Sequence, residues 1–227
     1  MNLLKKTGIW IFLLILFTHC LFIFLELDTY RFYSKLLLIP FLLLLFLLHF
    51  MGSKGKFFFL PLMALTGSFA GDLLLAFDGE QFFLWGMLGF MVTHICNSIY
   101  FYSMFPLHIT KSKVALLALL FLSITCSIVI FIIKDNAGAF LIPIIVYMIL
   151  IAFMAILASN LSAAPLYNHV AIQYFIPGAI LFIMSDGLLA INKFNLQDPS
   201  LDIFVMLTYG LAQLFLVMGY YKVKIQK

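Results

Sequence analysis

Apolar residues fill most of the chain in long runs, and short polar or charged stretches separate one run from the next. Each of these runs approaches the roughly 20 residues that an α-helix needs to cross a bilayer. The connections are too short to form a soluble domain. We therefore expect an all-α integral membrane bundle, a single domain over residues 1–227, with eight transmembrane helices near residues 8–25, 36–52, 57–77, 82–104, 114–133, 139–160, 171–191 and 202–221.

The composition supports a membrane protein. Of the 227 residues, 65% are hydrophobic and 10% are charged, whereas a soluble domain is about 45–50% apolar. Lys5 and Lys6 precede the first run, but no small-residue cleavage site follows, so we predict a retained helix. Cys20, Cys96 and Cys126 lie inside apolar runs, which favours packing over disulfides. We expect a multi-pass protein of a bacterial cytoplasmic membrane.

The thirteen Lys and Arg residues are distributed unevenly between alternate connections. One side has Arg31, Lys35, Lys134 and Lys193. The other side has Lys5, Lys6, Lys54, Lys56, Lys111, Lys113, Lys222, Lys224 and Lys227. The positive-inside rule then predicts that both termini are cytoplasmic. The net charge of +4 needs no nucleic-acid partner to explain it.

Two acidic residues, Asp72 and Asp186, lie within apolar runs, while the other seven lie in connections. Each is about five residues, or roughly 7–8 Å of helix, from the same membrane face. An ionisable side chain at a helix centre costs about 2.5–3.5 kcal/mol, so it normally faces protein or a water-filled cavity and marks a functional site. The alternative is that Asp72 only forms a hydrogen bond to a neighbouring helix.

The two acidic runs resemble each other. Residues 64–77 and 178–191 align without gaps and match at both Asp residues and at three Leu or Ala positions. This suggests a parallel repeat of four helices plus four, although Leu and Ala are abundant in this chain. Around Asp72, small residues recur at helical spacing, which suits either close helix contact or room for a ligand. They are Ala64, Gly67, Ser68, Gly71 and Ala76.

Five further polar residues lie in or beside the apolar runs. His94 and Asn97 share a helix face at a spacing of three, and Tyr209 and Gln213 share one at a spacing of four. Lys35 opens the second helix near the depth of the two acids. Each alone is typical of an interhelical hydrogen bond or of a lysine that reaches the interface. Together they predict a polar site in one half of the bundle.

The residues available within the predicted helices exclude several kinds of enzyme. A metal hydrolase needs about three ligands at one depth, and only His94 joins the two acids. The GxGD signature of intramembrane aspartyl proteases would need Gly where Phe69 stands. The sequence has no nucleophile elbow and no phosphate-binding loop. We therefore expect neither a metal nor a cofactor.

Two carboxyl groups at one depth can divide the work of acid–base catalysis. One keeps a proton while the other stays ionised, as in glycosidases, whose transition state resembles an oxocarbenium ion. The cleavage of a vinyl ether can use the same division between an acid and a base. An acid protonates the alkene carbon, water adds to the oxocarbenium ion, and the hemiacetal collapses to an aldehyde and an alcohol.

Six segments in order along the chain resemble the YhhN-like lysoplasmalogenase family. Leu36 replaces the family's usual Pro and Thr93 its common Ala, but neither change touches the two acids. The matching segments are Ser34-Lys35-Leu36-Leu37-Leu38, Gly71-Asp72-Leu73-Leu74-Leu75, Gly86 to Tyr100 with Thr93-His94, Tyr147 with Met154, Gly178 to Asp186, and Thr208-Tyr209-Gly210-Leu211-Ala212-Gln213.

The resemblance implies a membrane enzyme that hydrolyses the vinyl ether of lysoplasmalogens to a fatty aldehyde and a glycerophospho-ethanolamine or -choline. Asp72 and Asp186 would be the proton donor and the water-activating base, in an order that stays open. Supporting residues would hold water, the headgroup or the developing charge: Lys35, His94, Asn97, Tyr209 and Gln213. Headgroup preference, an ester-linked lysolipid as substrate, and the oligomeric state also stay open.

A proton-coupled transporter of small solutes is the alternative, because paired membrane carboxylates and a repeat also suit proton relays. Transporters tend to interrupt corresponding helices of their repeats with Gly or Pro. Here Pro40, Pro143 and Pro177 lie in helices that do not correspond. The pattern therefore favours the hydrolase.

Overall fold

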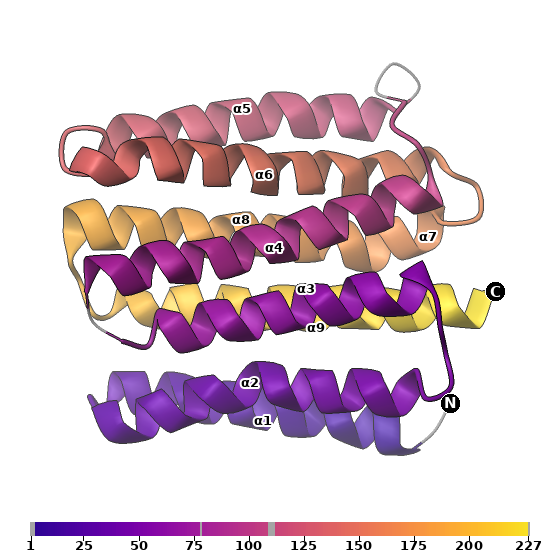
Figure 1. Ribbon diagram of the computed structural model, residues 1–227, viewed down its shortest axis with the longest axis horizontal. Coiled ribbons are helices and arrows are strands. Elements are labelled where there is room, and N and C mark those ends of the chain that lie inside the picture. Colours follow the sequence, from indigo (N-terminus) through magenta and orange to yellow (C-terminus); the bar gives the residue numbers. More distant parts are fainter. Residues whose placement is uncertain (1–2, 78, 109–111, 227) are drawn as a thin grey trace.

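The structure, a computed structural model, describes residues 3–77, 79–108 and 112–226. Within these residues all regular elements are helical, and eight helices are long and apolar enough to cross a membrane (Figure 1). The predicted all-α fold with eight spans is confirmed. The long helices are α1 (Leu3–Phe24), α2 (Asp28–His49), α3 (Lys56–Leu74), α4 (Glu80–Met104), α5 (Lys113–Ile133), α6 (Leu141–Asn160), α8 (Ile176–Ile191) and α9 (Leu201–Gln226).

Short helical turns lengthen the sixth and seventh spans. The 3-10 turns η2 (Gly138–Phe140) and η3 (Leu161–Ala163) flank α6. The seventh span begins with α7 (Asn168–Val170) and the π-helical turn η4 (Ala171–Phe175), continues through α8, and ends in a second π-helical turn, η5 (Asn192–Leu196). Because of η5, this span runs five residues past the predicted end of the helix.

Successive spans run in opposite directions, so the two ends of the described chain lie at the same end of the bundle (Figure 1). We call the opposite end the distal end; the α1–α2, α3–α4, α5–α6 and α8–α9 connections form it. α3 packs against α4, α8 against α9, and α1 against α2. α4 and α9 are the most buried spans and α5 is the least buried. The cytoplasmic orientation of the termini and the four-plus-four repeat stay predictions.

The small residues of α3 provide a close contact with α4. A Cβ atom on Gly89 of α4 would lie 2.7 Å from the backbone nitrogen of Gly71 and 2.9 Å from the carbonyl oxygen of Gly67. The two backbones therefore touch, as small residues at helix interfaces permit. Thr93 of α4 donates a hydrogen bond from Oγ1 to the carbonyl oxygen of Ala64, at 2.9 Å. This contact fixes the position of the helix that carries Asp72.

The second span begins well before the predicted range, at Asp28. Its first turns are polar, and their side chains find partners on other helices. Arg31 Nη2 lies 2.6 Å from Asp202 Oδ2 of α9, and Ser34 Oγ lies 2.8 Å from His19 Nδ1 of α1. Because these partners satisfy the polar groups, the chain continues as helix through a stretch that its composition alone marks as a loop.

Candidate active site

Asp72 of α3 and Asp186 of α8 line one cavity of about 230 Å³ near the distal end of the bundle. Tyr209 and Lys35 line it too, so α2, α3, α8 and α9 all contribute polar residues. Asp72 is 3% exposed and the Asp186 side chain is 13% exposed. We call this space the polar cavity. It unites two acids that lie 114 residues apart in the sequence.

Asp72 is held by α9 and faces a cation on α2. Tyr209 donates a hydrogen bond from its hydroxyl group to Asp72 Oδ2, at 2.7 Å. The Tyr209 ring is fixed by edge-on contacts with Phe90 and Phe182, whose ring centroids lie 5.7 and 5.6 Å away. Lys35 lines the same cavity as Asp72.

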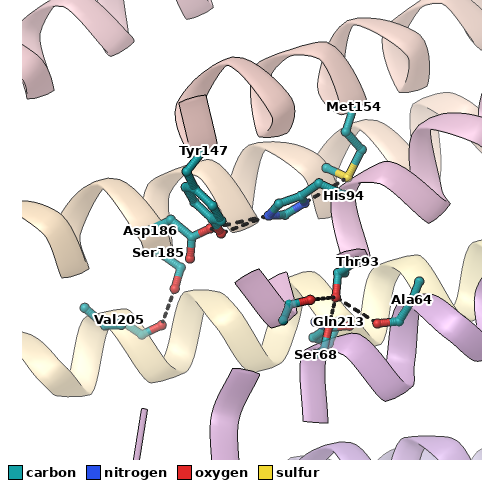
Figure 2. Close-up of polar contacts among 11 residues, drawn as sticks. Ala64, Ser68, Thr93, His94, Tyr147, Met154, Ser185, Asp186, Val205 and Gln213 are labelled. Carbon is teal, nitrogen blue, oxygen red and sulfur yellow. Dashed lines mark hydrogen bonds and ion pairs between the residues drawn. The ribbon is translucent and has the colours of Figure 1, made fainter. Parts of the chain in front are cut away.

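Asp186 belongs to a chain of contacts that runs away from the polar cavity (Figure 2). Tyr147 of α6 donates a hydrogen bond from its hydroxyl group to Asp186 Oδ2. His94 of α4 places Nε2 2.9 Å from the Tyr147 hydroxyl oxygen and 3.8 Å from Asp186 Oδ2. The other ring nitrogen of His94 lies 3.5 Å from Met154 Sδ. His94 is fully buried, and the Tyr147 hydroxyl oxygen lies closer to its Nε2 than Asp186 does.

Gln213 lies outside the polar cavity in a separate network that joins three helices (Figure 2). Its amide nitrogen donates to Ser68 Oγ of α3 at 2.8 Å, and Ser68 Oγ lies 3.0 Å from Thr93 Oγ1 of α4. Gln213 and Tyr209 are one turn apart on α9, so the network fixes the height of Tyr209 against Asp72. Gln213 is thus placed to support the site without lining the cavity.

The shared helix face with His94 predicted that Asn97 lies at the site of the two acids. The structure does not place it there. Asn97 does not line the polar cavity, and Tyr220 of α9 donates its hydroxyl hydrogen to Asn97 Oδ1. Asn97 is 1% exposed and lies in the second half of α4. Of the five supporting residues predicted, Lys35 and Tyr209 line the cavity, and His94 contacts Asp186 across 3.8 Å.

Several residues of the site were not singled out by the sequence. Arg31 and Lys193 line the polar cavity together with Lys35. Four basic residues were assigned to the membrane face with fewer positive charges, and three of them therefore line the polar cavity. Arg31 is 35% exposed, so this part of the cavity reaches the surface. The convergence was readable in principle, because Lys35 and Arg31 are four residues apart and share a helix face.

Arg31 and Lys193 line the part of the cavity that reaches the surface, which we call the cationic mouth. One partner of each residue holds this mouth in shape. Asp202, also a cavity residue, pairs with Arg31 and accepts a hydrogen bond from the Asn192 side chain at 3.0 Å. The Lys193 ammonium lies over the ring of Phe83, 4.6 Å from its centroid. The π-helical turn η5 carries both Asn192 and Lys193, so the extra turn at the end of the seventh span builds one wall of the mouth.

A second, smaller cavity of about 60 Å³ adjoins the polar one, and apolar side chains of α4, α5, α6 and α8 dominate its lining. We call it the apolar cavity. Asp186 lines both cavities, while Tyr147 lines only the apolar one. Within residues 3–77, 79–108 and 112–226, no cluster of three or more His, Cys, Asp or Glu side chains could hold a metal ion.

The fold and the site define a class of protein: a multi-pass membrane helical bundle in which two acids from within the spans, Asp72 and Asp186, line an internal cavity. The chain belongs to the YhhN family, whose model matches residues 30–220. This confirms the family that the sequence motifs indicated.

Two curated relatives carry the name lysoplasmalogenase TMEM86A. The protein from Bos taurus is 32% identical over 161 residues, and the protein from Homo sapiens is 31% identical over 161 residues. Both matches cover 69% of this chain and 63% of the relative. The chain therefore matches less than two thirds of the length of either relative. No solved structure matches this chain.

Proposed function

We propose that this protein hydrolyses the vinyl ether bond of lysoplasmalogens and releases a fatty aldehyde and a glycerophospho-ethanolamine or -choline. One observation carries the proposal: the two acids line a polar cavity with three cationic side chains, and an apolar cavity begins at one of these acids. The name of the two relatives supports the same reaction.

The polar cavity suits the headgroup of such a lipid. Arg31, Lys35 and Lys193 present cations around it, and guanidinium and ammonium groups bind phosphate oxygens through charge-assisted hydrogen bonds. The partly exposed side chain of Arg31 marks the mouth through which this end of the lipid contacts water. If the termini are cytoplasmic, as the charge distribution predicts, the headgroup enters from the opposite face of the membrane.

The apolar cavity suits the start of the hydrocarbon chain, next to the vinyl ether. α5, the least buried span, contributes Leu122, Cys126 and Val129 to its lining. A single chain that entered beside α5 would leave the bilayer for an equally apolar space at little cost in free energy. The bond between headgroup and chain would then lie beside Asp186, where the two cavities meet.

The two carboxyl groups supply the acid and the base that vinyl ether hydrolysis needs. A proton transferred to the alkene carbon gives an oxocarbenium ion, a water molecule activated by a carboxylate adds to it, and the resulting hemiacetal breaks into alcohol and aldehyde. Positioned acid and base groups each contribute about 10²- to 10⁴-fold to such reactions. The carboxylate charges also stabilise the cationic intermediate.

The test is aldehyde release by the purified protein in detergent from three lysophospholipids with the same headgroup. They carry a vinyl ether, a saturated ether or an ester at the same position. We expect aldehyde from the vinyl ether and no cleavage of the other two. Fatty acid release from the ester would show that the lysolipid ester is the substrate. Solute uptake into proteoliposomes, with all three lipids left intact, would favour the transporter.

The cationic mouth gives a second prediction. Arg31→Gln or Lys193→Gln should raise KM for the vinyl ether substrate about tenfold and leave kcat nearly unchanged, because a hydrogen bond to a charged group is worth about 1.5–3 kcal/mol. Lys134→Gln is the matched control, since Lys134 is the fourth basic residue of this face and does not line the cavity. Equal KM values for all three variants and the wild type would contradict a headgroup site at the mouth.

A further inference from the structure

The two acids occupy different places along the combined cavity. Asp72 lines only the polar cavity, together with Lys35 and Tyr209. Asp186 lines both cavities, and its partner Tyr147 lies on the apolar side. A lipid that runs from the cationic mouth into the apolar cavity therefore meets Asp186 where the two cavities join, while Asp72 lies on the polar side of this junction.

A lysoplasmalogen has a fixed order of atoms along the same path. From the headgroup inward come the glycerol carbon, the ether oxygen, the first alkene carbon, the second alkene carbon and the chain. Acid cleavage uses these atoms unequally. The proton must go to the second alkene carbon, on the chain side, and water must go to the first, which is bonded to the ether oxygen on the headgroup side.

We propose that Asp186 is the general acid that protonates the second alkene carbon and that Asp72 is the general base that activates the water. This assignment rests on the proposed function and on the orientation of the lipid that the two cavities impose. With the headgroup at Arg31 and Lys193 and the chain beneath α5, the chain-side carbon faces the acid at the junction. The headgroup-side carbon and the ether oxygen face Asp72.

The partners of Asp186 fit an acid that becomes a carboxylate. Tyr147 donates its hydrogen to Oδ2, and His94 also lies on the Oδ2 side, so Oδ1 is the oxygen left to deliver a proton into the cavity. Since the single hydrogen of the Tyr147 hydroxyl goes to Asp186, His94 must donate from Nε2 to the Tyr147 oxygen. Tyr147 and His94 are then positioning residues that stabilise the charge left on Asp186 once its proton has gone.

The surroundings of Asp72 fit the base. Tyr209 donates a hydrogen bond to Oδ2 at 2.7 Å, and the cationic side chains of Arg31, Lys35 and Lys193 line the same cavity. The second oxygen of Asp72 is left to accept a proton from water in the polar cavity.

The cycle then closes without any further proton carrier. Asp186 gives its proton to the second alkene carbon and the double bond becomes an oxocarbenium ion. Water adds to the first carbon and gives a proton to Asp72. In the collapse, Asp72 returns this proton to the ether oxygen as the carbon–oxygen bond breaks, and Asp186 takes the hemiacetal hydroxyl proton. The products are an alcohol and an aldehyde, and both acids regain their starting states.

Hydrogen exchange in D₂O separates the two roles. Asp72→Asn keeps the acid but lacks the base, so the oxocarbenium ion should often return to substrate. Recovered lysoplasmalogen should then carry deuterium on the second alkene carbon, while aldehyde release is lost. Asp186→Asn lacks the acid, so it should neither exchange nor hydrolyse. Mass spectrometry of the recovered lipid measures the exchange, and Asp135→Asn, an exposed acid of the distal end, should hydrolyse like the wild type.

Exchange by Asp186→Asn, or its absence in folded Asp72→Asn, would overturn the assignment. A wild-type protein that releases no aldehyde would instead refute the proposed function, so the two failures are distinguishable. A second pair of variants covers the case in which an Asn variant does not fold. Tyr209→Phe should raise the ratio of exchange to turnover above the wild-type value, whereas Tyr147→Phe should slow both together; the opposite pattern would also refute the assignment.

Discussion

Asp72→Asn and Asp186→Asn should each lower kcat for lysoplasmalogen hydrolysis by about 10³-fold, because each removes one partner of the acid–base pair. Asn has the shape of Asp and can still accept the hydrogen bonds of Tyr209 and Tyr147, so the loss should not reflect a collapsed site. Aldehyde release under substrate saturation is the measurement, with thermal unfolding in detergent as the check on folding.

The double variant provides a sharper form of this prediction. Two groups that act on one reaction as a unit give non-additive effects, so the double variant should be little slower than the more impaired single variant. Asp135→Asn again serves as the control at the same end of the bundle. Turnover within a few-fold of the wild type in either folded single variant would exclude that residue from the chemistry.

Gly89→Leu should prevent α3 and α4 from packing and should abolish the folded protein. Even Gly89→Ala should cost roughly 1–3 kcal/mol, because its Cβ would lie 2.7 Å from the backbone nitrogen of Gly71 and a backbone atom cannot move aside. Gly187→Ala is the matched control: the nearest atom, Val129 Cγ2, is 3.6 Å away, and Ala is the better helix former.

Gel filtration and thermal unfolding in detergent measure these effects. We expect Gly89→Leu to elute as aggregate, Gly89→Ala to unfold at a lower temperature than the wild type, and Gly187→Ala to unfold at or above the wild-type temperature. A folded Gly89→Leu protein with wild-type thermal stability would show that the helices are not in backbone contact at this point.

The spans were predictable because lipid imposes a strong pattern. Every backbone group of a span must be satisfied within its helix, so long apolar runs with short breaks leave little choice of fold. The ends of the helices were less predictable. The polar start of α2 is helical because Arg31 finds Asp202 on α9, a partner 171 residues away that local composition cannot reveal.

The two acids could be found from sequence because a charge inside an apolar run is rare. Tyr147 was harder to find, since a tyrosine is unremarkable in such a run, and only the family resemblance drew attention to it. Asn97 shows the opposite problem. Its helical spacing from His94 suggested a common site, but the Tyr220 hydroxyl is its partner, and spacing along one helix cannot say which neighbouring helix a side chain meets.

If the proposed cleavage takes place where the polar and apolar cavities join at Asp186, the position of the broken bond also decides where the two products go. Cleavage at the boundary between the polar cavity and the apolar cavity would produce a water-soluble fragment on one side and a bilayer-soluble fragment on the other. The two fragments would depart by different exits, so neither needs to wait for the other. Accumulation of aldehyde in the surrounding lipid would then slow the enzyme independently of how much soluble headgroup has built up outside.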